Sequence, residues 1–158
     1  LFSGSIKDNI AYAKLDATMM EIKRAAKLVN ADNFIQKLSD GYETVIGESG
    51  DSLSTGQKQL VSFARALLAD PRIFVLDEAT SSIDTEMEQI IQEAIERILS
   101  GRTNIIIAHR LSTIRSADRI ICLKDGKIIE EGNHHNLLAK KSYYYNLYTT
   151  QFREDLKA

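Results

Sequence analysis

The apolar run Ile73–Leu76, followed at once by Asp77 and Glu78, constrains the fold of this chain more than any other feature. Four successive apolar residues that end in two carboxylates are typical of a buried parallel strand. Open α/β sheets place their ligands beyond the carboxyl ends of such strands. One carboxylate can organise Mg²⁺, and the other can polarise a water for attack on a phosphoryl group. The segment therefore favours phosphoryl chemistry, and the simpler alternative is a strand end with two solvated carboxylates.

Helical periodicity and capping residues predict helices on both sides of this strand. Thr18, with Glu21 three residues later, matches the capping-box pattern, and Ser54 or Thr55 is a plausible cap for a second helix. The predicted elements are mostly helix over 1–40, including a short helix over 31–38, loop over 41–52, helix over 56–69, strand over 73–77, helix over 85–99, strand over 104–108, helix over 111–116, a hairpin over 119–131 and helix from 133. Strands separated by helices favour a parallel sheet, and Asp125-Gly126 adds an antiparallel hairpin.

Composition narrows the class of protein. A chain that is 44% hydrophobic and 27% charged is ordinary for a globular protein, and a net charge of −2 gives no basic field for nucleic acid. The lone Cys122 lies in an apolar stretch, which predicts a buried packing residue, and we interpret the pair His134-His135 as structural. Because the chain opens on Leu1 and not on Met, we expect it to be part of a longer polypeptide.

Four segments occur in an order and spacing that resemble the nucleotide-binding domain of ABC transporters. They are Leu53–Gln57, Ile73–Glu78, Ser81–Asp84 and the lone His109, and the resemblance covers essentially the whole chain. It implies an α/β fold: a partial P-loop NTPase-like core sheet, mostly parallel with a closing antiparallel hairpin, and an α-helical signature subdomain. The implied division is a signature subdomain over 1–70 and the C-terminal part of a RecA-like ATPase core, with C-terminal helices, over 71–158.

The segment Leu53–Gln57 resembles the family signature, which usually reads L-S-G-G-Q, and it departs from that pattern at Thr55. The resemblance implies that Ser54, Thr55, Gly56 and Gln57 contact the γ-phosphate of ATP in trans. A serine hydroxyl, backbone N–H groups and a helix N-terminus suit a phosphate. The simpler alternative is an N-cap and turn, a common use of Ser-Thr-Gly.

The strand over 73–77 resembles the Walker B segment of the family. By that resemblance Asp77 helps to hold Mg²⁺, and Glu78 is the general base that orients the attacking water. His109 resembles the switch histidine that contacts the γ-phosphate, although a lone histidine at a strand end is commonly a solvated surface residue. Ser82 and Asp84 resemble the D-loop at the dimer interface, where Asp84 could also serve as an N-cap.

The segment Thr44–Glu48 resembles the x-loop of exporter-type members, and Leu1–Ile6 resembles the exporter stretch that follows the Q-loop. The resemblance implies that Glu48 couples to the transmembrane domain, while the alternative is an exposed loop with a glycine turn. No G-x-x-x-x-G-K-[ST] loop occurs in the 158 residues, so the sequence contains no cradle for the triphosphate.

Three hypotheses follow. In the first, the parent protein is an exporter-type ABC transporter ATPase at the cytoplasmic face of the cell membrane. It uses ATP and Mg²⁺ and works with a second nucleotide-binding domain, head to tail, and with a transmembrane domain; the isolated chain is inactive. In the second, the chain is only a folding or dimerisation module. A third, another P-loop ATPase of the recombination or chaperone-like kind, offers no reason for Leu53–Gln57.

Overall fold

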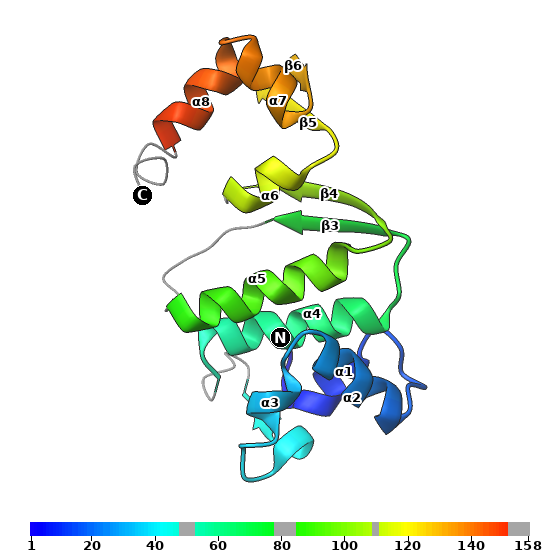
Figure 1. Cartoon of the computed structure of the whole chain (residues 1–158). Helices are drawn as coiled ribbons and strands as arrows, with labels where there is room; N and C mark the ends of the chain where they lie inside the picture. Colours follow the sequence, from blue (N-terminus) through cyan, green and yellow to red (C-terminus); the bar gives the residue numbers. More distant parts are fainter. Residues whose placement is uncertain (48–52, 78–84, 109–110, 152–158) are drawn as a thin grey trace. The chain divides into compact units, whose positions relative to one another are not determined.

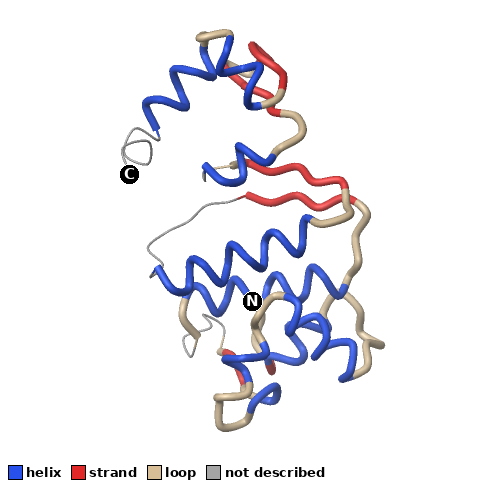
Figure 2. Tube along the Cα trace, in the orientation of Figure 1, coloured by secondary structure: helices blue, strands red, loops and turns tan. Residues whose placement is uncertain are grey.

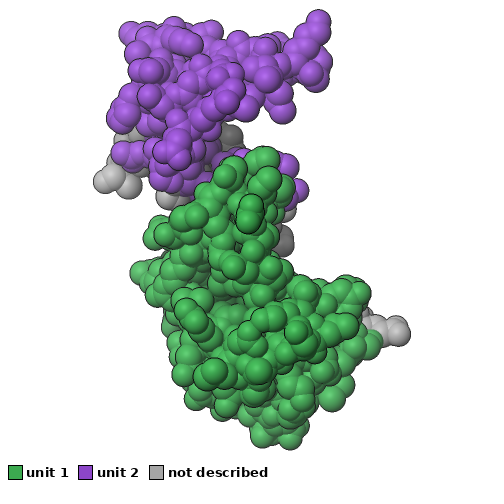
Figure 3. Space-filling view, turned by 90° about the vertical axis from the view of Figure 1, so that its right-hand side faces the viewer, with its two compact units in different colours: residues 1–76, 80–105 green, residues 77–79, 106–158 purple. Residues whose placement is uncertain are grey.

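The computed structural model describes residues 1–47, 53–77, 85–108 and 111–151, and it divides the chain into two compact units (Figures 1 and 3). Unit 1 comprises 1–76 and 80–105, and unit 2 comprises 77–79 and 106–158. Both units mix helices and strands, which confirms the predicted α/β class. The predicted functional division at residue 70 stays a prediction.

Unit 1 is built mainly from helices (Figure 2). Its elements, in chain order, are β1 (Gly4–Ser5), α1 (Ile6–Ala11), α2 (Met19–Leu28), α3 (Asp32–Ile35), the 3₁₀ helix η1 (Gly41–Glu43), β2 (Val45–Ile46), α4 (Thr55–Leu68), β3 (Ile73–Asp77), α5 (Thr85–Leu99) and β4 (Thr103–Ile107). Helix α4 packs against α1, α2 and α5, so it forms the centre of this unit. Its apolar stripe, which includes Leu60, Val61 and Ala64, is fully or nearly fully buried.

Helix α2 begins where the capping box predicts. The Thr18 hydroxyl accepts a hydrogen bond from the backbone N–H of Glu21, and the Glu21 carboxylate accepts one from the backbone N–H of Thr18. Ile22, Ala25 and Ala26 are buried on one face of the helix. The predicted N-terminus of α2 is therefore confirmed, and its buried residues lie at helical spacing.

Three local predictions for the first half of the chain were wrong. The segment Gly4–Ser5 is a strand, not a helix, and it pairs antiparallel with Val45–Ile46, inside the stretch predicted as loop. That predicted loop also contains the 3₁₀ helix η1. The helix predicted from Ala31 to Leu38 is shorter than expected, because after Ile35 the chain turns through i→i−3 hydrogen bonds, from Lys37 N–H to the Phe34 carbonyl and from Leu38 N–H to the Ile35 carbonyl.

The strand predicted over 73–77 is present as β3, but its burial differs from the prediction. Phe74 and Leu76 are buried, whereas Ile73 and Val75 are 60% and 65% exposed. Among the described residues β3 pairs only with β4, and the two strands run in the same direction in Figure 1. Side chains alternate between the two faces of a strand, so only one face of β3 is packed here.

Unit 2 contains α6 (Leu111–Ser116), β5 (Ile120–Lys124), β6 (Lys127–Gly132), α7 (His134–Ala139) and α8 (Tyr143–Gln151). Asp125 and Gly126 join β5 to β6 with φ angles of 50° and 72°, which confirms the predicted hairpin. Cys122, Leu137, Tyr144 and Tyr148 form the buried cluster of the unit. Burial raises the pKa of the Cys122 thiol, in keeping with its predicted role as a packing residue.

His134 is also structural, as predicted. It is buried, and its Nδ1 lies 2.7 Å from the hydroxyl of Tyr144. Burial lowers its pKa, with smaller contributions from His135 and Arg115, so the neutral ring is favoured at this position. Among the described residues, no helix is both long and apolar enough to cross a membrane.

Candidate functional site

The first candidate feature is the start of α4. Ser54 is the N-cap, with an extended backbone at φ −64° and ψ 162°. Its Oγ accepts a hydrogen bond of 3.3 Å from the backbone N–H of Gln57, and the Oε1 of Gln57 accepts one of 3.0 Å from the backbone N–H of Ser54. Leu53 is buried just before the cap, while Ser54 and Thr55 are exposed. The cap residue Ser54 and the first helical residue Thr55 therefore lie at the surface, at the start of α4.

Among the helix starts of unit 1 that the structure describes, those of α1, α2 and α4 have a capping box, and they differ in charge. In α1 and α2 the third helical residue is a carboxylate, Asp8 and Glu21 respectively. In α4 that position holds the neutral Gln57, and the first turn has no acidic residue. The partial positive charge at the start of α4 is therefore not neutralised by its own first turn, which suits an external anion.

Gly56 has a packing role that the sequence did not reveal. It is buried, and a Cβ atom placed on it would lie 2.3 Å from Cγ and 2.9 Å from Sδ of Met87 in α5. The missing side chain thus lets α5 approach the first turn of α4 closely. The backbone N–H of Gly56 still belongs to that turn.

Asp77 is the last residue of β3, and it is exposed at the carboxyl end of the strand. Among the described residues, no group of three or more His, Cys, Asp or Glu side chains is arranged to hold a metal ion. A single carboxylate is still compatible with Mg²⁺, because this ion is commonly bound by one or two carboxylates together with substrate phosphates and water. Glu48, Glu78, Ser82, Asp84 and His109 lie outside the described residues.

The structure brings together the two segments with exporter-like sequence. Gly4 pairs with Ile46 and Ser5 with Val45, and the backbone N–H of Ile6 donates to the carbonyl of Thr44 at 3.0 Å. An ion pair of 2.7 Å between Lys7 and Glu43 lies beside this short ladder. Leu1–Ile6 and Thr44–Gly47 are therefore one structural element, although they are far apart in the sequence.

Sequence reasoning missed two buried polar residues, Asn9, which holds this element, and Asp32, which holds the adjacent helix η1. Asn9 is 2% exposed; its Oδ1 accepts from the backbone N–H of Phe2, and its Nδ2 donates to the carbonyls of Phe2 and Ser5. Asp32 is 5% exposed and accepts a 2.6 Å hydrogen bond from the Tyr42 hydroxyl. Burial, and then this bond, raises the pKa of Tyr42, so the phenol stays protonated. A polar residue on the apolar face of a predicted helix is the signal that could have identified Asn9.

The comparisons with known proteins agree on one family. Residues 3–81, half of the chain, match the family model described as ABC transporter. The chain is 53% identical over 154 residues to the ABC transporter ATP-binding protein YfiC of Bacillus subtilis (strain 168) and 54% identical over 155 residues to an ATP-dependent lipid A-core flippase of Syntrophus aciditrophicus (strain SB). Each match covers 98% of this chain and 26% of the relative.

Among solved structures, a bacterial Atm1-family ABC exporter with ATP bound matches with a TM-score of 0.85 and 42% identity, over 96% of this chain and 26% of that one. The α/β fold is thus that of part of an exporter nucleotide-binding domain. The chain belongs to the ABC transporter family. It spans about a quarter of the length of the relatives it matches.

Proposed function

We propose that this chain is the part of an exporter motor domain that supplies the signature helix and the acidic strand for ATP hydrolysis. The observation that carries the proposal is the start of α4, where an exposed serine caps a helix whose first turn has no carboxylate. Such a helix start can bind a phosphate through its N–H groups and its partial positive charge. In the parent protein, hydrolysis would drive export of a substrate across the membrane.

The signature residues would act on ATP held by a second nucleotide-binding domain. Because the Ser54 Oγ accepts from the N–H of Gln57, the proton of this hydroxyl can be donated to a phosphate oxygen. The backbone N–H groups of Thr55 and Gly56 lie in the same first turn. Gln57 would hold the cap in place, since its side chain accepts from the backbone of Ser54.

The remaining predicted residues would act on ATP held by the same domain. Asp77 would contribute a carboxylate oxygen to Mg²⁺, which supplies charge neutralisation at the phosphates when bound. Glu78 would accept a hydrogen bond and then the proton from the attacking water at a carboxylate oxygen. His109 would donate a ring N–H to the γ-phosphate.

The proposal includes two partners. A second nucleotide-binding domain would pair head to tail with this one, with Ser82 and Asp84 at the interface. A transmembrane domain would contact Glu48, which follows β2 in the sequence. The motor domain would then lie at the cytoplasmic face of the cell membrane.

The substitution Glu78→Gln in the full-length parent tests this proposal. We expect ATP binding to be unchanged and turnover to fall by about a hundredfold or more, because a general base contributes on that order. Glu96→Gln, the same change at an exposed position of α5, is the matched control and should leave turnover unchanged. If Glu78→Gln hydrolyses ATP at the rate of the parent, Glu78 has no part in the mechanism.

One observation favours the second candidate, a module for folding or dimerisation only. Ile73 and Val75 of β3 and Ile105 of β4 are each more than half exposed, which leaves apolar sheet surface open to another chain. Calorimetric titration of the 158-residue chain with Mg-ATP, combined with sedimentation, tests this candidate. Self-association without nucleotide binding would support it, and clear binding of ATP would exclude it.

A further inference from the structure

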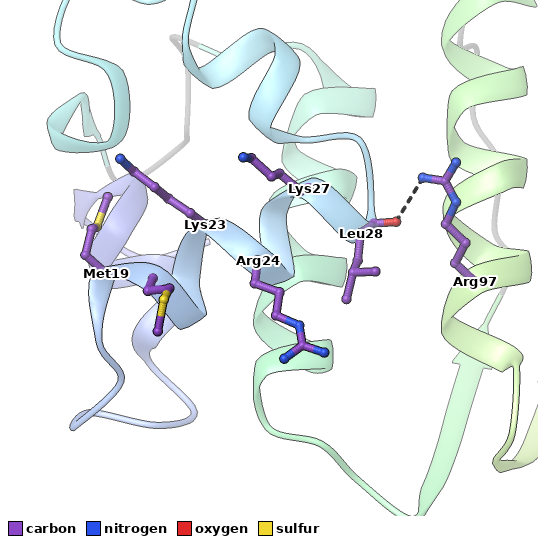
Figure 4. A pocket seen from close by; sticks show the side chains of 7 residues that line it. Met19, Lys23, Arg24, Lys27, Leu28 and Arg97 are labelled. Carbon is purple, nitrogen blue, oxygen red and sulfur yellow. Dashed lines mark hydrogen bonds between the residues drawn. The ribbon is translucent and has the colours of Figure 1, made fainter.

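A second surface feature lies in unit 1, on the exposed side of α2. A groove of about 650 Å³ runs along this helix beside Arg97 of α5 (Figure 4). We call it the basic groove. Its lining residues are Met19, Met20, Lys23, Arg24, Lys27, Leu28 and Arg97.

The sequence of α2 explains why this face is both apolar and basic. Residues Ile22, Ala25 and Ala26 turn inward and are buried. On the outer side, Met20, Arg24 and Leu28 follow one another at a spacing of four and lie in one row of the helix. Met20 is 78% exposed and Leu28 is 45% exposed, so the row has an apolar residue at each end and a cation between them.

The charge of the groove is of one sign. Four of its lining residues are cations and none is a carboxylate, although the chain as a whole carries a net charge of −2. The nearest acid on α2, Glu21, is bound to Lys14 and to the cap residue Thr18. Within the part of the chain that the structure describes, Arg24 and Lys27 have no hydrogen bond or ion pair through their side chains. These two cations are therefore available to an external anion.

Arg97 is held in place at one end of the groove. Its guanidinium donates to the carbonyl of Leu28 at 3.2 Å and to Oδ1 of Asn30 at 2.8 Å, and Glu93 lies 3.6 Å away. Figure 4 shows the bond to Leu28 as a dashed line between the two helices. These contacts fix the end of α2 against α5, so the groove is formed before any ligand arrives, which lowers the entropic cost of binding.

We propose that the basic groove docks an acidic amphipathic helix of a partner protein. A row of side chains at a spacing of four is the surface into which a second helix packs its own side chains. Exposed methionines are common on surfaces that bind helices, because their side chains adapt to different partners. Carboxylates on the polar edges of the partner helix would meet Arg24 and Lys27.

An anionic lipid, like an acidic amphipathic helix, combines negative charge with apolar surface, but its acyl chain fits the groove less well. Such a chain needs a continuous apolar path, and Arg24 interrupts the path between Met20 and Leu28. A partner helix that carries an apolar residue at every turn can contact both Met20 and Leu28, which lie about two turns apart, and the polar residues beside its apolar stripe can meet the cations. The arrangement therefore favours the helix.

Fluorescence anisotropy with the full 158-residue chain tests the proposal. The probe is a labelled synthetic peptide in which leucine repeats every third or fourth residue and glutamate fills the other positions. The control peptide has lysine in place of glutamate. We expect only the glutamate peptide to bind, and we expect Arg24→Glu and Lys27→Glu each to weaken it about tenfold. Lys37→Glu, an equal charge change on an exposed residue outside the groove, should leave binding unchanged.

A further variant separates the apolar part of the groove from its charge. Met20→Ser keeps all four cations and should weaken the peptide about threefold or more, because it removes exposed apolar surface. Circular dichroism of each variant verifies that it is folded. Equal weakening by Arg24→Glu and Lys37→Glu would overturn the proposal. So would binding of phosphatidylglycerol vesicles in place of the peptide, with loss of that binding in Arg24→Glu.

Discussion

Helices α2 and α4 begin with the same pair of reciprocal hydrogen bonds but with opposite electrostatic arrangements. In α2 the cap is Thr18 and the third helical residue is Glu21, whose carboxylate also binds Lys14. In α4 the cap is Ser54 and the third residue is the neutral Gln57. The first helix satisfies its N-terminus with its own charge, and the second satisfies only its hydrogen bonds.

The difference shows how a structural cap can be told from a cap that also serves a ligand. Capping residues alone do not separate the two, because Ser, Thr and Asn are common at every helix start. A carboxylate in the first turn repels a phosphate, whereas a glutamine keeps the capping geometry without the charge. On this criterion α4, and not α1 or α2, has the helix start suited to a phosphate.

The substitution Gln57→Glu in the full-length parent tests this comparison most strongly. This substitution would give α4 a capping box with glutamate at the third helical position, as in α2, and would place a negative charge in the first turn. We expect ATP turnover to fall on the order of a hundredfold. The new carboxylate and the phosphate are like charges, and their repulsion at close range in a site partly shielded from water costs several kcal/mol. The stability of the domain should be unchanged or slightly higher.

The matched control for Gln57→Glu is the opposite substitution in α2, Glu21→Gln, which should leave turnover unchanged. Turnover measured by phosphate release for both variants gives the comparison directly. Full activity of Gln57→Glu would mean that the charge of the first turn does not matter for nucleotide, and the distinction between α2 and α4 would have no functional meaning.

A second test concerns the close contact of Gly56 with α5. We expect Gly56→Ala to lower the free energy of unfolding by about 1–2 kcal/mol, because the new Cβ would overlap Met87, whose Cγ lies too near its own backbone to move freely. Without that overlap, alanine stabilises a helix relative to glycine by up to about 1 kcal/mol.

Urea unfolding of Gly56→Ala in a Met87→Ala background separates the overlap with Met87 from the helix propensity of alanine. There Gly56→Ala should be neutral or slightly stabilising, and the double-mutant cycle reports the coupling between the two residues. An equal loss of stability in both backgrounds would show that the cost lies in the backbone and not in the contact with α5.

The smallest expected effect is a pH dependence that the start of α2 should have and the start of α4 should not. The hydrogen bond from Lys14, followed by the bonds from Thr18, lowers the pKa of Glu21 from 4.5 to about 2. A group whose folded pKa is lowered adds stability above its unfolded pKa, and this stability is lost as the pH falls toward the folded value. The difference in urea midpoint between the parent chain and Glu21→Gln should thus shrink between pH 4.5 and pH 2. The difference in urea midpoint between the parent chain and Gln57→Ala should not change over this pH range.

Much of the fold was predictable because its signals are local. The caps Thr18 and Ser54, the periodic apolar face of α5, and the turn at Asp125-Gly126 each depend on residues within a few positions of one another. The wrong predictions depend on distant partners. Nothing near Gly4 indicates a strand, because its partner is Ile46, and nothing near Ile35 indicates an early helix end.

The candidate site was predictable in its residue types and not in its packing. Ser54 and Gln57 were identified from their pattern, and the structure gives them the geometry of a capping box. The contact of Gly56 with Met87 joins two helices across a long stretch of sequence, so no local pattern could reveal it. The roles of Glu48, Glu78, Ser82, Asp84 and His109 stay predictions.

The short ladder between β1 and β2 has a consequence for the order in which the chain folds. Pairing Ser5 with Val45 closes a loop of about 40 residues, at an entropic cost of about 3 kcal/mol. Strands of two residues each cannot offset that cost alone. We therefore expect α1 and α2, which lie within the loop and pack on α4, to dock before the ladder forms, so that the ladder is a late step in folding and an early point of local opening.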